Sequence, residues 1–498
     1  MSGLGDRHSG TLGGRLNELG SSEQTVTVTI EVGCAGRPDV QHAAWMLVNL
    51  LSRMEGIVTA VELAGEDAPL IGRVIPFQTG AGTLQGAFLA AAETIGAVPV
   101  RHTGAAGMGL LLIVGPGGDT EGLRVHGEGW CGAIRQGPIA SRRASKLPFG
   151  PYVAACLAAG EVFRRLRMDP KRHPPTKGLS LSAWDCTRGE GTIHDAGPER
   201  LEATLDFGLA GAGAVGCALM HTLWACPGLN GAAVIADSDE KGIDTTNLNR
   251  CVIFNRTHLG DRKASIAAAV CAEADIVWEP VDALYARDTL PRRPELVVSA
   301  VDKNRSRDQI QQGFWPARLL GASTKDLRAE LLRCGPPGIG QCLRCYNPPE
   351  TDIPSDVRRE QLRDLSETEL AAFAAQIDQP LALVRQWARD GGCSEVAEAA
   401  LGFMQDQDEP PAMFAVGFVS VLAGVLLAGE VVKEHLGRPA PLDDEHQSVK
   451  FQFWNPGATL NGCPRRVGRD PNCPACRPNT PGVQVWLQRA RDWRPPGD

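Results

Sequence analysis

Three glycines and the acid that follows them have the types and spacing to hold a nucleotide. The stretch GAGAVG places Gly211, Gly213 and Gly216 as in a nucleotide-binding turn and runs into an apolar helical pattern. The next apolar strand, GAAVIAD, ends at Asp237, where a Rossmann-type protein holds the adenosine ribose. Such turns serve NAD, FAD and ATP enzymes alike, so the nucleotide has to be identified from the residues beyond them.

The residues beyond the turn indicate phosphate binding. Asn247, Arg250 and Lys263 share one short polar span, and Asp302 comes just after an apolar strand, at the carboxyl edge where α/β sheets bind ligands. A carboxylate there can hold Mg²⁺ while the two cations neutralise phosphate charge. The set predicts ATP chemistry. The alternatives are solvated surface charges at 250 and 263 and a helix cap at 302.

Two C-x₂-C pairs far apart in the sequence predict a structural zinc site. They are CLRC, with Cys342 and Cys345, and CPAC, with Cys473 and Cys476. Four thiolates favour tetrahedral zinc and leave no open catalytic position. Cys463 is a rival fourth ligand without the pair spacing, and two unrelated pairs of thiols are the alternative reading.

Cys393 differs from these because it follows two glycines and directly precedes a helical pattern. A thiolate at a helix N-terminus is favoured by the helix dipole, so Cys393 is a candidate nucleophile. The alternative is a small buried residue, which is the usual environment of cysteine.

The 498 residues must divide into more than one domain to position these groups. Strand-like and helical patterns alternate on both sides of a proline-rich break, and an apolar helix at 147–168 closes the first region. The predicted division is a disordered lead-in at 1–24, a first α/β domain at 25–168, a linker at 169–178, a second α/β domain with a mainly parallel, Rossmann-like sheet at 179–480 and a tail at 481–498.

Two segments of the second domain need separate interpretation. Acidic helical patterns at 350–410 predict an insertion in the sheet. The uncharged run at 412–429 just reaches the length of a membrane span, but Glu430 and Lys433 continue its helical face, which favours a helix buried against a sheet.

Overall charge and cysteine use narrow the class of protein. The formal net charge of −8 gives no footprint for nucleic acid or an anionic membrane. Fifteen cysteines spread along the chain do not look like a secreted disulfide framework, and the start lacks the apolar core of a signal peptide. We therefore expect a cytoplasmic protein without nucleic-acid or membrane partners.

The combined motifs resemble the ubiquitin-activating enzyme superfamily, which includes the ThiF-, MoeB- and HesA-type adenylyltransferases. The carrying elements are GAGAVG, the acid after the next strand, NLNR, the lysine of GDRKAS and the aspartate of VDKNRSR, in that order. The resemblance implies that the turn and first acid bind adenosine and that a later aspartate binds Mg²⁺. It implies that Asn247, Arg250 and Lys263 contact phosphates. The span before NLNR is about two residues longer than usual, so Asp239 competes with Asp237 for the ribose.

The resemblance implies that 179–480 is the adenylation domain and that 25–168 is a degenerate, inactive adenylation-like domain. It also implies a reaction and partners. The expected enzyme adenylates the C-terminal carboxylate of a ubiquitin-like or sulfur-carrier protein, forms a thioester on Cys393 and passes the carrier to a conjugating enzyme. Its length and insertion favour a prokaryotic ubiquitin-like conjugation system, with a bacterial antiviral role and a homodimer among the expectations. Relatives often take an arginine from a paired domain, and Arg135, Arg142 and Arg143 are candidates by composition only. The alternatives are adenylation of a carrier, small molecule or RNA base without a thioester, a nicotinamide-dependent oxidoreductase and an inactive binding scaffold.

Overall fold

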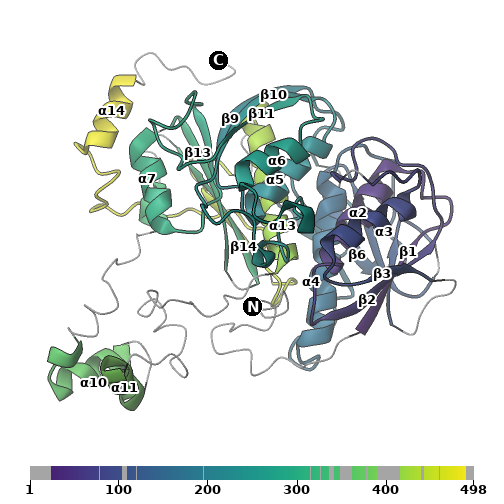
Figure 1. Ribbon diagram of the computed structural model, residues 1–498, viewed down its shortest axis with the longest axis horizontal. Coiled ribbons are helices and arrows are strands. Elements are labelled where there is room, and N and C mark those ends of the chain that lie inside the picture. Colours follow the sequence, from purple (N-terminus) through teal and green to yellow (C-terminus); the bar gives the residue numbers. More distant parts are fainter. Residues whose placement is uncertain are drawn as a thin grey trace.

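The structure is a computed structural model that contains two α/β halves (Figure 1). It describes residues 24–77, 79–103, 109–118, 120–194, 196–314, 316–325, 327–335, 341–347, 362–376, 380–390, 416–438, 442–458 and 460–489.

The first half is built on an eight-stranded sheet with the order β3-β2-β1-β4-β5-β6-β7-β8. Its strands are parallel from β3 to β5 and antiparallel from β5 to β8. The strands are β1 (Gln24–Ile30), β2 (Val58–Gly65), β3 (Val100–His102), β4 (Leu110–Val114), β5 (Leu123–Glu128), β6 (Cys131–Gln136), β7 (Gly178–Ser182) and β8 (Arg188–Gly189), and the helices are α2 (Pro38–Leu51), α3 (Leu84–Ile95) and α4 (Phe149–Arg167).

The second half is built on a seven-stranded sheet with the order β11-β10-β9-β12-β13-β14-β15, parallel up to β13 and antiparallel beyond it. The strands are β9 (Ala203–Ala210), β10 (Leu229–Ala236), β11 (Ile276–Val281), β12 (Leu296–Ser299), β13 (Arg318–Lys325), β14 (Arg328–Cys334) and β15 (Ser448–Gln452). The helices are α5 (Ala214–Ala225), α6 (Lys263–Val270), α7 (Asn304–Phe314), α8 (Leu343–Tyr346), α10 (Glu367–Gln376), α11 (Leu381–Asp390), α13 (Gly417–His435) and α14 (Pro481–Arg489), with short 3-10 turns η2 (Thr245–Asn247) and η3 (Arg256–His258).

The two sheets repeat one topology. In each half the first strand lies centrally, the second and third lie on one side, and the fourth to seventh follow on the other side. The direction changes from parallel to antiparallel after the fifth strand in both halves, and a long helix, α4 or α13, connects the sixth strand to the seventh. The expected α/β class with mainly parallel sheets is confirmed, and β1 is the counterpart of β9.

The boundary between the halves differs from the expected linker. The proline-rich segment at 169–178 leads from α4 into β7, and β7 and β8 pair within the first sheet. The first sheet therefore continues to Gly189. The proline-rich composition at 169–178 therefore marks a loop inside the first half and not a domain boundary. Such a composition does not separate the two cases, because a loop from a helix to an edge strand uses the same helix-breaking residues as a domain linker.

The helices α2, α4, α5 and α13 pack together between the two sheets (Figure 1). Helix α2 packs on α4, α5 packs on α13, and α4 packs on α13 across the two halves. A Cβ at Gly424 of α13 would overlap Ala218 of α5, so glycine permits this close helix crossing.

The apolar run expected at 412–429 forms part of this layer. Helix α13 is buried through nearly its whole length, and Lys433 Nζ donates to Glu430 Oε1 at 2.5 Å and to the Trp184 carbonyl at 2.7 Å. Among the described residues, no helix is long and apolar enough to cross a membrane. The reading of a helix buried against a sheet is borne out.

Helices α10 and α11 form a small unit of their own. They pack on each other around a separate apolar cluster that includes Leu370 and Val384, and Figure 1 shows the pair away from the two sheets. In sequence they lie between β14 and β15, where the acidic insertion was expected.

Candidate functional site

The glycine turn joins β9 to α5 at the carboxyl edge of the second sheet. Gly211 has φ of +99°, a conformation that L side chains rarely adopt, and a Cβ at Gly216 would overlap the Gly211 carbonyl. A Cβ at Gly213, the N-cap of α5, would meet nothing within 4 Å. The turn is therefore tightly packed at Gly216 and open at Gly213, next to the N-terminus of α5. In other folds, phosphates bind at such helix N-termini.

The two candidate ribose acids have different partners. Asp237 directly follows β10, and its carboxylate accepts hydrogen bonds from the backbone N–H of Ala212 at 2.8 Å and of Asp239 at 3.0 Å. The Asp239 carboxylate accepts from Lys263 Nζ. Burial raises the pKa of Asp239, but the Lys263 hydrogen bond and charge outweigh it, so the net pKa is lowered. Asp237 thus stabilises the glycine turn through the Ala212 N–H, and Asp239 positions the Lys263 ammonium group by an ion pair.

Asn247 and Arg250 lie on a loop that runs from η2 to η3. Asp244 and Asn247 form a reciprocal capping box that fixes the first turn. The Asn247 side chain is buried, whereas Arg250 is half-buried and donates to the Thr246 carbonyl at 3.4 Å. Further along the same loop, Val252, Ile253 and Phe254 are buried in the core. Arg250 is the charged residue of the segment 247–255.

Asp302 is exposed just before α7, in the segment that follows β12. Ser299 of β12 pairs with Ala210, and Ala300 donates to the Ala210 carbonyl at 2.8 Å. The Asp302 segment thus leaves the sheet beside Gly211. The structure therefore places the glycine turn, Asp237 and the Asp302 segment at one sheet edge, as the strand order of a Rossmann-like fold requires.

The corresponding edge of the first sheet is filled by side chains. The register aligns Ile30 with Ala210, so Glu31 stands where the second half has Gly211. Arg124 of β5, which is fully buried, forms an ion pair with Glu31. The backbone N–H of Ala35 still donates to Glu66 at 2.9 Å, as Ala212 does to Asp237.

The position of Asp302 has also changed in the first half. Val114 aligns with Ser299, which puts Gly117 at the place of Asp302. The first half thus keeps the contact between Ala35 and Glu66, but it has Glu31 at the position of Gly211 and Gly117 at the position of Asp302.

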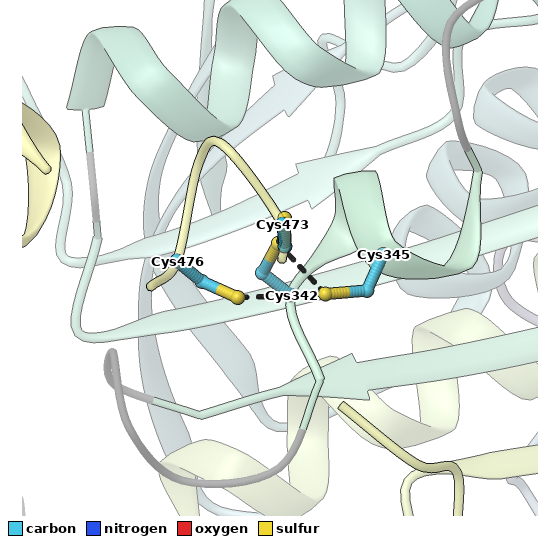
Figure 2. A group of neighbouring side chains, drawn as sticks. All are labelled: Cys342, Cys345, Cys473 and Cys476. Carbon is cyan, nitrogen blue, oxygen red and sulfur yellow. Dashed lines mark hydrogen bonds between the residues drawn. The ribbon is translucent and has the colours of Figure 1, made fainter. Parts of the chain in front are cut away.

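The four cysteines of the two C-x₂-C pairs lie together (Figure 2). Their sulfur atoms lie within 4.8 Å of one another. Cys342 Sγ is 3.7 Å from Sγ of both Cys345 and Cys473, and Cys345 Sγ is 3.4 Å from Cys476 Sγ. A tetrahedral zinc with Zn–S bonds of about 2.3 Å separates its sulfurs by about 3.8 Å, so the donor set fits zinc.

The environment of the cluster fits a structural metal. Hydrogen bonds from Cys342 and Cys476 lower the pKa of the Cys345 thiol, which favours a thiolate. Cys463, the rival ligand, is exposed and lies outside the cluster. One C-x₂-C pair lies at α8, which follows β14, and the other lies in the segment that leads into α14. A zinc ion bound by both pairs would therefore link the C-terminal segment to the second sheet. In the described part of the chain the cysteines form no disulfide.

Comparison with known proteins identifies the family. The ThiF family model matches residues 187–475, which is more than half of the chain. The chain belongs to the ThiF family. This confirms the resemblance drawn from GAGAVG, NLNR and the later aspartate, all of which lie inside the matched residues.

More distant matches cover the ThiF-family chain only in part. The uncharacterized protein y4jF of Sinorhizobium fredii is 26% identical over 355 residues, 63% of this chain and 65% of that protein. E. coli MccB, solved with ATP, is 17% identical with a TM-score of 0.36, covering 55% of this chain and 66% of MccB. The microcin C7 biosynthetic enzyme MccB in complex with N-formylated MccA is 15% identical with a TM-score of 0.35, over 55% and 67%. The chain thus spans about two thirds of these proteins, and the assignment rests on the family match.

The remaining sequence-predicted residues are Cys393 and the three candidate arginines. Cys393 lies outside the described residues. Arg135 and Arg142 are exposed in the first half, and Arg143 forms an ion pair with Glu199.

Sequence reasoning missed Arg53, which reaches from the first half to the loop that carries Arg250. In the sequence, Arg53 is only an arginine that follows an apolar helical pattern. Its complete burial, which marks it as unusual, is visible only in the fold.

Proposed function

We propose that this ThiF-family enzyme uses ATP to adenylate the C-terminal carboxylate of a small ubiquitin-like or sulfur-carrier protein. The observation that carries the proposal is the sheet edge that joins the glycine turn, the Asp237 brace and the Asp239–Lys263 pair within the matched residues. The substrate carboxylate oxygen attacks the α-phosphorus of ATP, the bond from that phosphorus to the bridging oxygen breaks, and pyrophosphate leaves.

Each residue has a proposed part in this step. The turn with Gly211, Gly213 and Gly216 takes the phosphates and ribose close to its backbone, with Asp237 or Asp239 on the ribose hydroxyls. Asn247, Arg250 and Lys263 contact the phosphates and offset the charge that develops on them. Burial lowers the pKa of Lys263, but the ion pair with Asp239 outweighs this effect, so the net pKa is raised and Lys263 stays protonated. When ATP binds, the Lys263 ammonium group exchanges Asp239 for a phosphate oxygen. Asp302 would hold Mg²⁺, which supplies charge compensation at the phosphates.

We propose that the first half is a non-catalytic copy of the adenylation half. Its sheet has the same strand order, but Glu31 and Arg124 occupy the edge where the second half has Gly211. Gly117 at the place of Asp302 removes the metal ligand. The enzyme then acts with one nucleotide site per chain, and homodimerisation is not required for it.

We further propose that Cys393 captures the acyl group and passes it to a conjugating partner. The Cys393 thiolate attacks the carbonyl of the acyl-adenylate, AMP leaves, and a thioester forms. This step makes the enzyme a ubiquitin-like modifier activator, whereas an enzyme without it stops at the adenylate.

The Cys393→Ala variant separates the two reactions. Adenylation needs no thiol, so the variant should exchange pyrophosphate with ATP at the wild-type rate while losing the thiol-sensitive adduct with its carrier. Cys463→Ala, which changes an exposed cysteine outside the zinc cluster, should keep both. An adduct that persists without Cys393 assigns the nucleophile to another cysteine, and no adduct in wild type that exchanges pyrophosphate favours adenylation alone.

A further inference from the structure

Arg53 is a fully buried arginine that crosses from one half of the molecule to the other. It lies just after α2 in the first half, and its guanidinium donates to three backbone carbonyls of the second half. Nη1 donates to Leu248 at 2.5 Å, and Nη2 donates to Phe254 at 2.9 Å and to Val252 at 3.4 Å. These carbonyls belong to the loop that carries Asn247 and Arg250.

Asn49 completes this contact from one helical turn earlier. Its Oδ1 accepts from Arg53 Nε at 2.7 Å, and its Nδ2 donates to the Val252 carbonyl at 3.0 Å. Both side chains are fully buried. The two side chains therefore fix the positions of three loop carbonyls relative to α2 through directional hydrogen bonds.

The contacted carbonyls flank the candidate phosphate ligand. Leu248 and Val252 lie two residues before and two residues after Arg250. Between η2 and η3 the loop belongs to no helix or strand, and the carbonyls of Leu248, Val252 and Phe254 accept hydrogen bonds from side chains of the first half. Removing Arg53 would take away this donor from the Leu248 and Phe254 carbonyls, whereas the Val252 carbonyl would keep Asn49.

Further contacts from the first half support the far end of the loop. Asn255 Nδ2 donates to Thr94 Oγ1 at 3.1 Å, and Arg256 donates to the Gly96 carbonyl. Both partners belong to the C-terminal end of α3. The first half thus holds the loop on both sides of Phe254.

Arg53 also differs from an ordinary buried ion pair. Among the described residues, its hydrogen-bond partners are carbonyls and the Asn49 amide, with no carboxylate. Burial lowers the pKa of Arg53 to about 10, which still leaves it protonated at neutral pH. Its charge is solvated by the loop carbonyls, so the loop and the guanidinium each require the other in place.

We propose that Arg53, supported by Asn49, is a positioning residue that holds the loop in the shape that presents Asn247 and Arg250 to the phosphates of ATP. The inference rests on the proposed function. It makes the first half part of the nucleotide site without any contact to the nucleotide.

The test compares buried arginines in the full-length protein. Binding of Mg²⁺ and the non-hydrolysable analogue AMPCPP is measured by calorimetry for wild type, Arg53→Lys, Asn49→Ala and the control Arg124→Lys, with circular dichroism melting for each. Arg124 is as buried as Arg53, but its ion pair with Glu31 stays within the first half. Lysine keeps the charge and cannot span three carbonyls.

We expect Arg53→Lys and Asn49→Ala to weaken AMPCPP binding about tenfold or more while remaining folded at the assay temperature. Arg124→Lys should lower the melting temperature and leave the affinity within about twofold of wild type. Arg53→Lys and Asn49→Ala with wild-type affinity, or an equal loss in Arg124→Lys, would overturn the inference. Wild type that binds no AMPCPP would instead overturn the proposed function, and this inference with it.

Discussion

Gly213 and Gly216 lie in the same turn but face different surroundings. A Cβ at Gly216 would overlap the carbonyl of Gly211, whereas a Cβ at Gly213 would point into open space at the end of α5. Asp237 braces the turn from below through the Ala212 N–H. Gly216 is therefore required by packing, whereas Gly213 borders open space in which the proposed phosphates would lie.

This difference predicts two distinct phenotypes. Gly216→Ala should destabilise the fold by about 2 kcal/mol, because the backbone must move to admit the new atom. Gly213→Ala should melt near wild type but lose ATP affinity, because its methyl group occupies the space proposed for phosphate. Melting curves and AMPCPP titrations of the two variants check this. Unchanged affinity in Gly213→Ala would place the phosphates elsewhere.

At the scale of elements, local spacing predicted more than long-range pairing did. The C-x₂-C pairs predicted the sulfur cluster because two residue types at fixed spacing define half of a tetrahedral site without reference to the rest of the chain. The buried helix near 412–429 was predicted because Glu430 and Lys433 continue its face; in the structure they neutralise each other and the helix runs on to His435.

A degenerate adenylation-like first half was predicted, but no glycine-turn motif in its sequence marks the topology that it shares with the second half. Glu31 and Gly117 replace the residues that would have signalled a second nucleotide site, and only the strand register aligns them with Gly211 and Asp302. The contact of Arg53 with the Arg250 loop was missed for a related reason, since it joins residues 195 apart in the sequence.

The cluster of Cys342, Cys345, Cys473 and Cys476 predicts a bound zinc ion. Purified protein should contain about one zinc per chain, and Cys342→Ser or Cys476→Ser should lose it together with several degrees of melting temperature. Cys463→Ser should retain the zinc and the stability, because Cys463 lies outside the cluster. Nucleotide affinity should change less than stability in all of them. Metal-free protein of normal stability would refute the site.

At the scale of the whole molecule, the layer of helices between the sheets joins the halves through buried aromatic and imidazole rings. His221 of α5 stacks on Tyr152 of α4 with ring centroids 5.1 Å apart, and His42 of α2 makes a T-shaped contact with Tyr152, with centroids 5.7 Å apart. Burial lowers the pKa of His42 to about 4 and that of His221 to about 3. Both imidazoles are therefore neutral in the folded protein at neutral pH.

These histidines make the junction sensitive to acid. Below pH 6.5 the unfolded chain takes up protons that the folded chain does not, so each histidine lowers stability by about 1.4 kcal/mol per pH unit down to its folded pKa. Burial raises the pKa of Glu430 to about 7, and this carboxyl gives the opposite slope between its usual pKa and 7. We expect wild type to lose more stability between pH 6.5 and 5 than His221→Phe does. Parallel denaturation profiles for the two proteins would show that His221 does not titrate on unfolding.

The central claim is ATP-dependent activation of a protein carboxylate at the Gly211–Asp302 edge, and pyrophosphate exchange tests it most directly. With ATP, Mg²⁺ and a ubiquitin-like or sulfur-carrier protein with a free C-terminus, wild type should exchange labelled pyrophosphate into ATP. The same carrier with an amidated C-terminus should support none. Asp302→Ala should remain folded and lose at least about a hundredfold in rate, because the lost charge compensation is worth several kcal/mol. Exchange that persists with the amidated carrier, or near-wild-type exchange in Asp302→Ala, would contradict the account.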